Sequence, residues 1–183
     1  GKIGTYVYDH TTVAADARYM DDIASMVDRV LIDISWNNVM INETTVNWEK
    51  LIFYENFFRN LSARSLEIVV QFDPTRSPPD WIDINFDMDG YRIITVPTDE
   101  DDYNYYKTHL LNYVNITINY FKNASYLVDD IEWCLADEPN SESWVTILQS
   151  MFNLIKEQDP NSVVSLVEHK PELYDAFSNT YDM

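Results

Sequence analysis

Short strand-forming segments alternate with longer helical segments along this chain, and this order restricts the fold more than any other feature of the sequence. Polar–apolar alternation and β-branched runs predict strands over 2–8, 30–36, 66–72, 130–138 and 163–167, with a sixth starting near 176. Apolar residues at helical spacing predict helices over 14–29, 48–61, 99–122 and 141–157. Strands separated by helices pair in parallel through right-handed crossovers. We therefore expect a single α/β domain spanning residues 1–183.

Two architectures satisfy this order, an open doubly wound sheet and a (β/α) barrel. A doubly wound sheet that binds a dinucleotide needs a glycine-rich turn after its first strand. The only glycines of this chain are residues 1, 4 and 90. A loop that cradles phosphates cannot be built from them, so most nucleotide chemistry is excluded and no cofactor is expected.

The stretch Ile131–Pro139 indicates which of the two architectures applies. Alternation places Ile131, Trp133 and Leu135 on one face, whereas the smaller or polar residues Glu132, Cys134, Ala136 and Glu138 share the other. Large apolar side chains on one face suit packing under helices, and the other face suits a narrow barrel interior. Proline cannot donate to a sheet, so the strand is expected to end at Pro139. Glu138 then becomes its last inward-pointing residue, at the carboxyl end where barrel enzymes carry their chemistry.

The charge balance and the cysteine count exclude several classes of protein. With 183 residues and 46% hydrophobic residues, the chain is long enough and apolar enough for one globular domain. A net charge of −19 argues against nucleic acid and anionic membrane as partners. The single cysteine excludes an internal disulfide, and no apolar run is long enough to span a membrane. No signal peptide is recognisable, as expected of a mature or trimmed chain.

Four N-glycosylation sequons occur, with acceptors at Asn42, Asn60, Asn115 and Asn123. The 16 asparagines and 24 serines and threonines of the chain predict roughly two sequons by chance. The excess favours an extracellular or cell-surface glycoprotein. The alternative is a sequence that is merely rich in asparagine.

The motifs and their order resemble the first part of a clan A glycoside hydrolase, an eight-stranded (β/α) barrel. The resemblance covers nearly the whole chain and rests on Ile34–Asn37 with Val46–Leu51, Val69–Asp73 with Pro78–Trp81, Leu135–Pro139, Leu154–Asn161 and Phe177–Asp182. It implies that Glu138 is the general acid/base of a retaining hydrolysis and that the ligand is carbohydrate. It also implies a barrel that is incomplete in this chain, with about six strands. A complete barrel takes about 250 residues.

Two departures from the family pattern affect the expected chemistry. The family carries an asparagine before its acid, for the sugar 2-hydroxyl, and this chain has Asp137 there. The family's nucleophile ends the seventh strand, which lies beyond this chain. Retaining hydrolysis needs two carboxyl groups about 5–5.5 Å apart. The nucleophile is therefore expected outside these 183 residues.

Six further residues are candidates for substrate binding, each with a structural alternative. Asp137 orients Glu138 or binds a hydroxyl, or else is a solvated acid, and Trp36 and Trp81 are sugar platforms or packing residues. Asp73 contacts a ligand or forms a turn with Pro74. Glu168 and His169 bind hydroxyls or form a surface pair. No metal site is expected, because the three histidines have no ligand spacing, and the Gly-x-Ser-x-Gly elbow of serine hydrolases is absent.

Two functions remain open at this stage. One is a glycoside hydrolase acting on oligosaccharide or glycan. The other is a non-catalytic structural or carbohydrate-binding glycoprotein of a cell surface or filament that keeps the barrel. In both cases open strand edges are expected to pair, either with another copy or with the missing part of a longer chain.

Overall fold

The centre of the fold is a five-stranded parallel sheet whose strands follow one another in chain order, β1-β2-β3-β6-β7. The computed structural model describes residues 2–76, 78–124, 131–167 and 173–182. The five strands are β1 (Gly4–Tyr6), β2 (Arg29–Asp33), β3 (Glu67–Gln71), β6 (Ile131–Asp137) and β7 (Val164–Val167). An open doubly wound sheet reverses its strand order at a switch point, and this sheet does not. The order is that of a barrel, which confirms the predicted partial (β/α) barrel.

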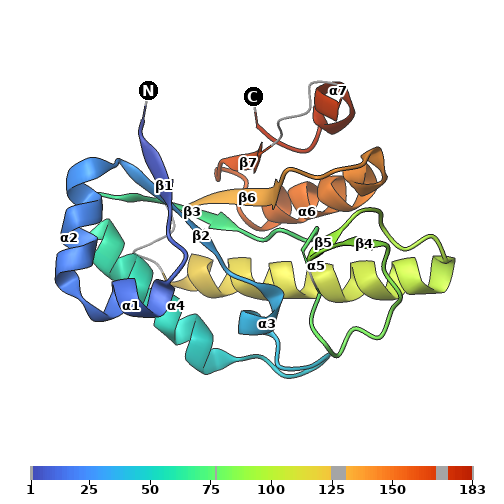
Figure 1. Ribbon diagram of the computed structural model, residues 1–183, viewed down its shortest axis with the longest axis horizontal. Helices are drawn as coiled ribbons and strands as arrows, with labels where there is room; N and C mark the ends of the chain where they lie inside the picture. The colour runs from blue at the N-terminus through green and yellow to red at the C-terminus, as the bar shows by residue number, and fades with distance from the viewer. Residues whose placement is uncertain (1, 77, 125–130, 168–172, 183) are drawn as a thin grey trace.

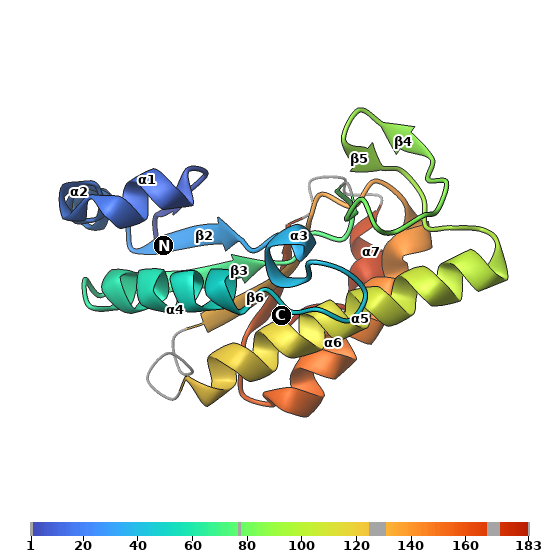
Figure 2. The same ribbon diagram turned by 90° about the horizontal axis from the view of Figure 1, so that it is seen from below.

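The connections between the strands are mainly helical (Figures 1 and 2). They contain α1 (His10–Ala15), α2 (Ala17–Met26), α3 (Trp36–Val39), α4 (Trp48–Ser62), α5 (Glu100–Asn123), the 3₁₀ turn η2 (Glu142–Trp144) and α6 (Val145–Gln158). The short α7 (Tyr174–Phe177) follows β7. The excursion after β3 forms a small antiparallel hairpin of β4 (Met88–Asp89) and β5 (Arg92–Ile93). No helix among the described residues has the length and apolarity that a membrane crossing requires.

The two faces of the sheet differ as the alternation predicted. On one face Val30, Ile32, Ile68, Val70 and Trp133 are buried in the hydrophobic core. On the other, Leu31, Val69 and Cys134 line an open cavity of about 300 Å³ together with Tyr6 and Ser165. Helices therefore cover the first face, and the second is the concave inner face of an incomplete barrel. The predicted orientations of Ile131, Trp133 and Leu135 against Glu132 and Cys134 are confirmed.

The longest helix, α5, holds the carboxyl ends of two strands in place. It runs beside α6 and below the sheet in Figure 1. The hydroxyl of Tyr113 donates to the carbonyl oxygen of Ile34 at 2.5 Å, and that of Tyr106 donates to the carbonyl oxygen of Pro74 at 2.7 Å. Both tyrosines are fully buried. These bonds fix the loops that follow β2 and β3, where the candidate site lies.

Several helix starts differ from the sequence-based expectation because side chains cap the backbone at other residues. The predicted helix over 14–29 is two helices, because Asp16 is extended and its carboxylate caps α2 by accepting from Arg18 N. Helix α5 is capped by Asp99, whose carboxylate accepts from Asp101 N and Asp102 N, so it begins at Glu100. Ser141 caps η2, so the predicted helix over 141–157 begins with a 3₁₀ turn.

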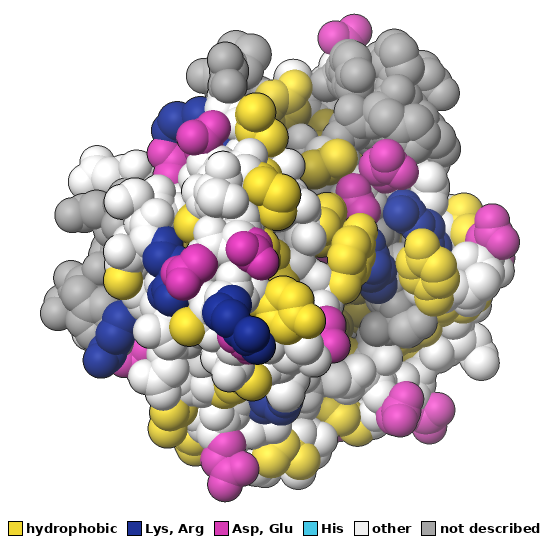
Figure 3. All heavy atoms as spheres, turned by 60° about the vertical axis from the view of Figure 1, so that its left-hand side comes forward, with side chains coloured by type: hydrophobic (Ala, Val, Ile, Leu, Met, Phe, Trp, Pro, Cys, Tyr) yellow, Lys and Arg dark blue, Asp and Glu magenta, His cyan; other side chains and the backbone are white. Residues whose placement is uncertain are grey.

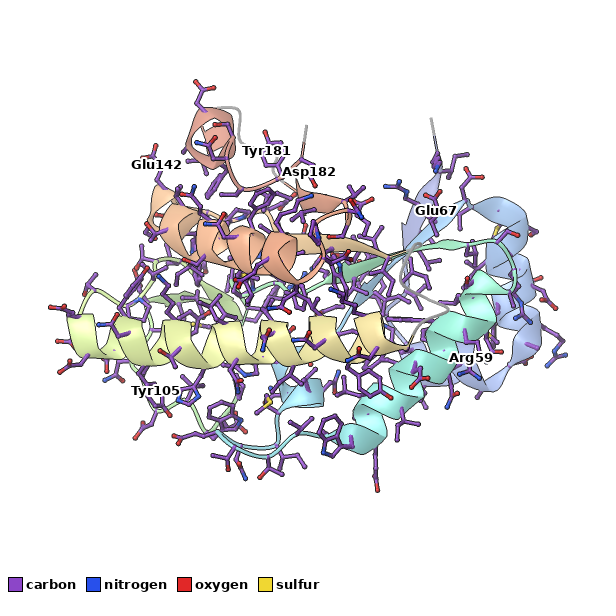
Figure 4. All side chains as sticks on the ribbon, turned by 180° about the vertical axis from the view of Figure 1, so that it is seen from behind. Arg59, Glu67, Tyr105, Glu142, Tyr181 and Asp182 are labelled. Atoms are coloured by element: carbon purple, nitrogen blue, oxygen red, sulfur yellow. The ribbon has the colours of Figure 1, made fainter. Side chains whose placement is uncertain are left out.

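The predicted sixth strand near residue 176 is wrong. Residues 174–177 form α7, and Thr180 N donates to the carbonyl oxygen of Phe177 at 2.9 Å in a turn. Asp182 then returns to β7, where its carboxylate accepts from Val164 N at 2.8 Å and lies 2.6 Å from Lys156 Nζ. Figure 4 shows Tyr181 and Asp182 beside this part of the sheet. The described part of the chain therefore supplies five strands of a barrel.

Candidate active site at the carboxyl ends of the strands

Acidic residues gather where β2, β3 and β6 end. Asp33 ends β2, Asp73 lies two residues after β3, and Asp137 and Glu138 lie at the end of β6. Because the strands are parallel, these residues share one edge of the sheet. An arginine from the loop after β3, Arg76, links two of them. Its Nε donates to Asp73 Oδ2, and its Nη2 donates to Asp137 Oδ2 at 3.1 Å.

A β-bulge in β6 changes which acidic residue faces the barrel interior. Cys134 pairs with Ser165 but Asp137 pairs with Val167, so β6 holds one more residue than β7 over this stretch. Asp137 therefore takes the inward place that strict alternation had assigned to Glu138. Glu138 follows with a left-handed backbone (φ 57°), and its side chain is 36% exposed. The expectation that Glu138 is the last inward residue is thus corrected by the extra residue.

Asp73 also has a left-handed backbone, with φ of 43°. Its amide nitrogen donates to the carbonyl oxygen of Leu135 at 3.1 Å, so the chain stays paired with β6 beyond the end of β3. The carboxylate accepts from Thr75 Oγ1 at 2.6 Å in addition to Arg76. Burial nevertheless raises the pKa of Asp73 above its ordinary value, although Thr75 and Arg76 oppose the shift. A left-handed backbone at a non-glycine residue costs about 1–2 kcal/mol, and two such residues end neighbouring strands here.

The hairpin after β3 brings a second arginine to the same acidic residues. Arg92, in β5, donates from Nη1 to the carbonyl oxygens of Asp137 and Glu138, both at 3.2 Å. Its Nη2 lies 3.9 Å from Asp137 Oδ2 and 3.9 Å from Glu138 Oε2. Arg92 of the hairpin therefore holds the end of β6 in two ways, by hydrogen bonds to the backbone of residues 137 and 138 and by attraction to their carboxylates.

Asp33 belongs to this cluster and was not among the residues expected from the sequence. Its Oδ1 is buried and has no hydrogen-bond partner among the described residues. Burial, together with the charges of Asp73 and Asp137, raises the pKa of Asp33 to about 7. The sequence did contain a sign of this position. Asp33 alternates with Arg29 and Leu31 in β2, so all three side chains point to the inner face of the sheet. It became significant only once the register placed it beside the other carboxylates.

Tyr6 and Gln71 cross the inner face below these acids. The Tyr6 hydroxyl donates to Gln71 Oε1, and Gln71 Nε2 donates to Asp73 Oδ2 at 3.4 Å. Burial, with the charge of Asp137 as the next cause, raises the pKa of Tyr6 well above its ordinary value. Tyr6 therefore remains a neutral hydrogen-bond donor, and it connects β1 through Gln71 to the Asp73 carboxylate.

The two candidate tryptophan platforms pack against each other and against α5. Trp36 is 6% exposed, stacks on Tyr113 with ring centroids 5.7 Å apart, and meets Trp81 edge-on at 5.7 Å. Trp81 is half-buried and also meets His109 edge-on. Trp36 lines a small cavity of about 70 Å³ with Asp33, Asp73 and Arg76. The burial of Trp36 favours the packing alternative at that position, because one ring face is already covered by Tyr113.

The remaining candidates lie elsewhere or outside the described residues. Glu168 and His169 fall in the range 168–172, outside the described residues. The sequon asparagines Asn42, Asn60 and Asn123 are exposed, whereas Asn115 is half-buried and accepts from Asn119 Nδ2 at 2.9 Å. Within the described ranges, no three His, Cys, Asp or Glu side chains are arranged to hold a metal ion. The expectation that no metal or cofactor is needed stays a prediction.

No protein-family model and no curated protein matches the sequence. The structure, in contrast, is similar to many solved structures, and the class they define is the (β/α) barrel of clan A glycoside hydrolases. A family 5 mannosidase from Rhizomucor miehei matches with a TM-score of 0.71 and 13% identity, over 98% of this chain and 54% of that one. A family 39 glycoside hydrolase from Bacteroides cellulosilyticus WH2 matches with a TM-score of 0.64 and 15% identity, over 89% of this chain and 30% of that one.

A further similar structure is a family 5 glycoside hydrolase from Streptomyces cattleya in complex with Manβ1-4GlcNAc. It has a TM-score of 0.63 and 14% identity, over 92% of this chain and 45% of that one. At such identities the likeness establishes the fold. The chain spans between 30% and 54% of the length of these structures, so it has the fold of part of such a barrel.

Proposed function

We propose that this chain is the acid/base part of a retaining glycoside hydrolase barrel that acts on neutral β-linked oligosaccharide or glycan. Glu138 is the general acid/base, and the nucleophile lies outside these 183 residues. One observation carries the proposal: Glu138 directly follows strand β6 of the barrel sheet with a strained left-handed backbone (φ 57°), beside a cluster of carboxylates and arginines. Strain of this kind persists where the surroundings enforce it, and it concentrates at functional sites.

The cluster gives each neighbour of Glu138 a distinct role. A general acid needs a proton and a fixed direction toward the leaving oxygen. Arg92 holds the backbone of residues 137 and 138, and Arg76 holds the Asp137 carboxylate. Asp137, tied to Arg76, positions this strand end. Asp33 retains a free carboxylate oxygen beside the cavity, which suits a substrate hydroxyl as donor.

The substrate class follows from charge and from the similar structures. A chain of net charge −19 disfavours anionic saccharides, which leaves neutral ones. Two of the similar structures are described as a mannosidase and as a complex with Manβ1-4GlcNAc. We therefore place β-mannosides first among the substrates to test. The four sequons support secretion and an extracellular or cell-surface site of action.

The deciding experiment measures hydrolysis of aryl β-mannosides and β-glucosides by the native polypeptide that contains these residues, with Glu138→Gln and Glu132→Gln compared. Loss of a general acid/base costs roughly 10²–10⁴ in rate. We expect that loss for Glu138→Gln, with partial rescue by azide, a nucleophile that needs no general base. Glu132→Gln makes the same change at the other end of the same strand and should keep its rate. Equal rates for all three proteins would overturn the proposal.

A second function is favoured by the burial of Trp36 and by the ion pairs that already occupy Asp137. These features reduce the surface that could bind sugar, as expected of a non-catalytic surface glycoprotein that keeps the barrel and assembles through its strand edges. The intact mass of the native protein after enzymatic deglycosylation separates the two. A mass of 21.5 kDa would leave no room for a nucleophile-bearing strand and would favour this second function. A much larger mass would favour the hydrolase.

A further inference from the structure

A groove between α4 and α5 lies on the outer, helical side of the molecule, and none of the candidate active-site residues lines it, although two sequon acceptors do. It has a volume of about 480 Å³. Its walls carry Trp48 and Glu55 from α4, and Asn115, Asn119, Tyr120 and Asn123 from α5. Figure 4 shows α4, with Arg59 labelled on it, crossing the carboxyl-terminal part of α5. A volume of this size accommodates a small ligand.

The groove combines an open aromatic ring with a row of amides. Trp48 is 57% exposed, and its ring centroid lies 6.3 Å from that of Tyr120. Asn115, Asn119 and Asn123 are four residues apart on α5, so they share one face of the helix. Asn119 Nδ2 donates to the backbone oxygen and to Oδ1 of Asn115, at 3.0 and 2.9 Å. The amide oxygen of Asn119 and the amide nitrogen of Asn115 take no part in these two bonds.

The one charged side chain among the described residues that line the groove, Glu55, is already paired. Glu55 accepts from the Tyr120 hydroxyl at 2.5 Å and lies 3.4 Å from Arg59. The groove therefore carries no excess of positive charge to attract an anion, and the chain as a whole repels one. A cation would meet amides and aromatic rings with a single, already paired carboxylate. Charge thus favours an uncharged ligand.

We propose that this groove is a second carbohydrate-binding site, which takes a free neutral oligosaccharide independently of the reaction at Glu138. A pyranose has an apolar C–H face, which suits the open ring of Trp48. Its hydroxyls both donate and accept, as amides do. If an apolar protein helix occupied the groove instead, the three amides would face apolar side chains, and burying them without hydrogen bonds would cost free energy. The proposal concerns binding only, so it stands or falls apart from the catalytic proposal.

The test uses the native polypeptide that contains these residues, made in a bacterial cytoplasm, where no N-glycan occupies Asn115 or Asn123. Mannotetraose and cellotetraose are the probes, followed by calorimetry and by the amide resonances of α4 and α5. Trp48→Ala should weaken binding about tenfold or more, a change of about 1.4 kcal/mol. Asn119→Ala should weaken it less, and Trp48→Tyr should retain most of it. Ile52→Ala removes another exposed side chain of α4 that does not line the groove, and should bind normally.

Three outcomes would overturn the proposal. The first is no binding of either probe by the unmodified chain. The second is binding that survives Trp48→Ala but is lost in Glu138→Gln, which would place the sugar at the candidate active site alone. The third is a groove that holds the chain's own glycan. It would show as no binding of free probe, with extra stability in glycosylated protein that Trp48→Ala abolishes.

Discussion

The two ends of the same parallel sheet carry ion pairs of different kinds. At the amino end, Arg29 lies 3.3 Å from both Glu67 and Glu132, and Lys2 also pairs with Glu67, so two cations meet two anions. At the carboxyl end, Asp33, Asp73, Asp137 and Glu138 gather, and among the described residues the cations that pair with them are Arg76 and Arg92. Figure 4 shows Glu67 at one end of the sheet and Glu142, just beyond β6, at the other. One end is balanced and the other is overloaded with carboxylates.

The pKa shifts at the two ends run in opposite directions. The hydrogen bond from Lys2 lowers the pKa of Glu67, so the amino end favours its charged form. Burial raises the pKa values of Asp33 and Asp73, so the carboxyl end disfavours theirs. On the face shown in Figure 3, Lys and Arg side chains lie next to Asp and Glu side chains, with hydrophobic side chains between them. The amino end thus resembles an ordinary protein surface with paired charges. At the carboxyl end, buried carboxylates have raised pKa values, as is common at functional sites.

Backbone strain follows the same division. Near the amino end, the left-handed Ser65 (φ 61°) ends α4 in an ordinary way, with Leu66 N donating to the carbonyl oxygen of Leu61. At the carboxyl end, Asp73 and Glu138 are left-handed without ending a helix. Their conformations are enforced by pairing with neighbouring strands, so they cost stability without forming a helix cap. This difference is what the following experiments test.

The largest effect is expected from removing one arginine at each end. Arg76→Met leaves the buried Asp73 carboxylate without its charge partner, and breaking a buried pair costs about 3 kcal/mol or more. Arg29→Met breaks pairs that are one-fifth to two-fifths exposed, which should cost about 1 kcal/mol or less. Urea unfolding of both variants measures the difference. Equal losses would mean that the two ends are not energetically different.

The next effect concerns pH. Asp33 binds its proton more tightly in the folded state, since its pKa is about 7 there and 3.8 for an ordinary aspartate side chain. Its contribution to stability is therefore complete below pH 4 and is lost as the pH rises through 7. Three units correspond to roughly 4 kcal/mol at most, and we expect about 2 kcal/mol after solvent relaxation. The wild-type protein should lose stability from pH 4.5 to 7.5. In Asp33→Asn this loss should be smaller by about 2 kcal/mol, as measured by urea unfolding at each pH.

Glu67→Gln is the control of opposite sign for the pH experiment. The pKa of Glu67 is lowered in the folded protein. The carboxylate therefore contributes stability at pH values above its unfolded-state pKa, and this contribution is lost as the pH falls through its folded-state pKa. The difference between wild type and Glu67→Gln should therefore shrink below about pH 4.5 and stay constant between 4.5 and 7.5. An identical pH dependence of the two variants would remove the distinction between the two ends.

A smaller effect is expected at the amino end from Gly4→Ala. A Cβ at residue 4 would lie 2.9 Å from Arg29 Cγ, closer than packing allows. We expect a loss of about 1 kcal/mol, because the arginine stem must shift. The same substitution in an Arg29→Ala background should cost much less, since the conflicting atoms are gone. A double-mutant cycle by thermal unfolding measures this coupling, and independent effects would show that Arg29 does not lie over β1 in solution.

The smallest effect compares glycine at two left-handed residues. Glu138→Gly and Ser65→Gly should each gain about 0.5–1 kcal/mol, because glycine adopts positive φ without strain. Only Glu138→Gly should abolish hydrolysis by the native polypeptide. A stability loss at residue 138 would show that its side-chain contacts outweigh the strain, and would weaken the argument for a strained catalytic residue.

The sequence predicted the general architecture but not the membership of the site. Alternation in 131–135 correctly separated the residues under the helices from those of the barrel interior, because each neighbour in a strand points to the opposite face. It failed after Leu135, because the bulge between Cys134 and Asp137 adds a residue. Arg76 and Arg92 were not expected at the site because both reach it from loop and hairpin residues whose path depends on pairing with other segments. Helix α7 was mistaken for the start of a sixth strand, because a four-residue helix is too short to show a helical period.

By itself the sequence determined that strands and helices alternate, which residues of each strand are apolar, and that glycine is too scarce for a phosphate loop. These are local properties, set by side-chain chemistry and spacing. Only the tertiary structure decided that the strands lie in chain order, that Asp33 joins Asp73 and Asp137, and that Asp137 rather than Glu138 faces inward. Those outcomes depend on strand register and on contacts between residues more than 30 positions apart, and no local pattern encodes such contacts.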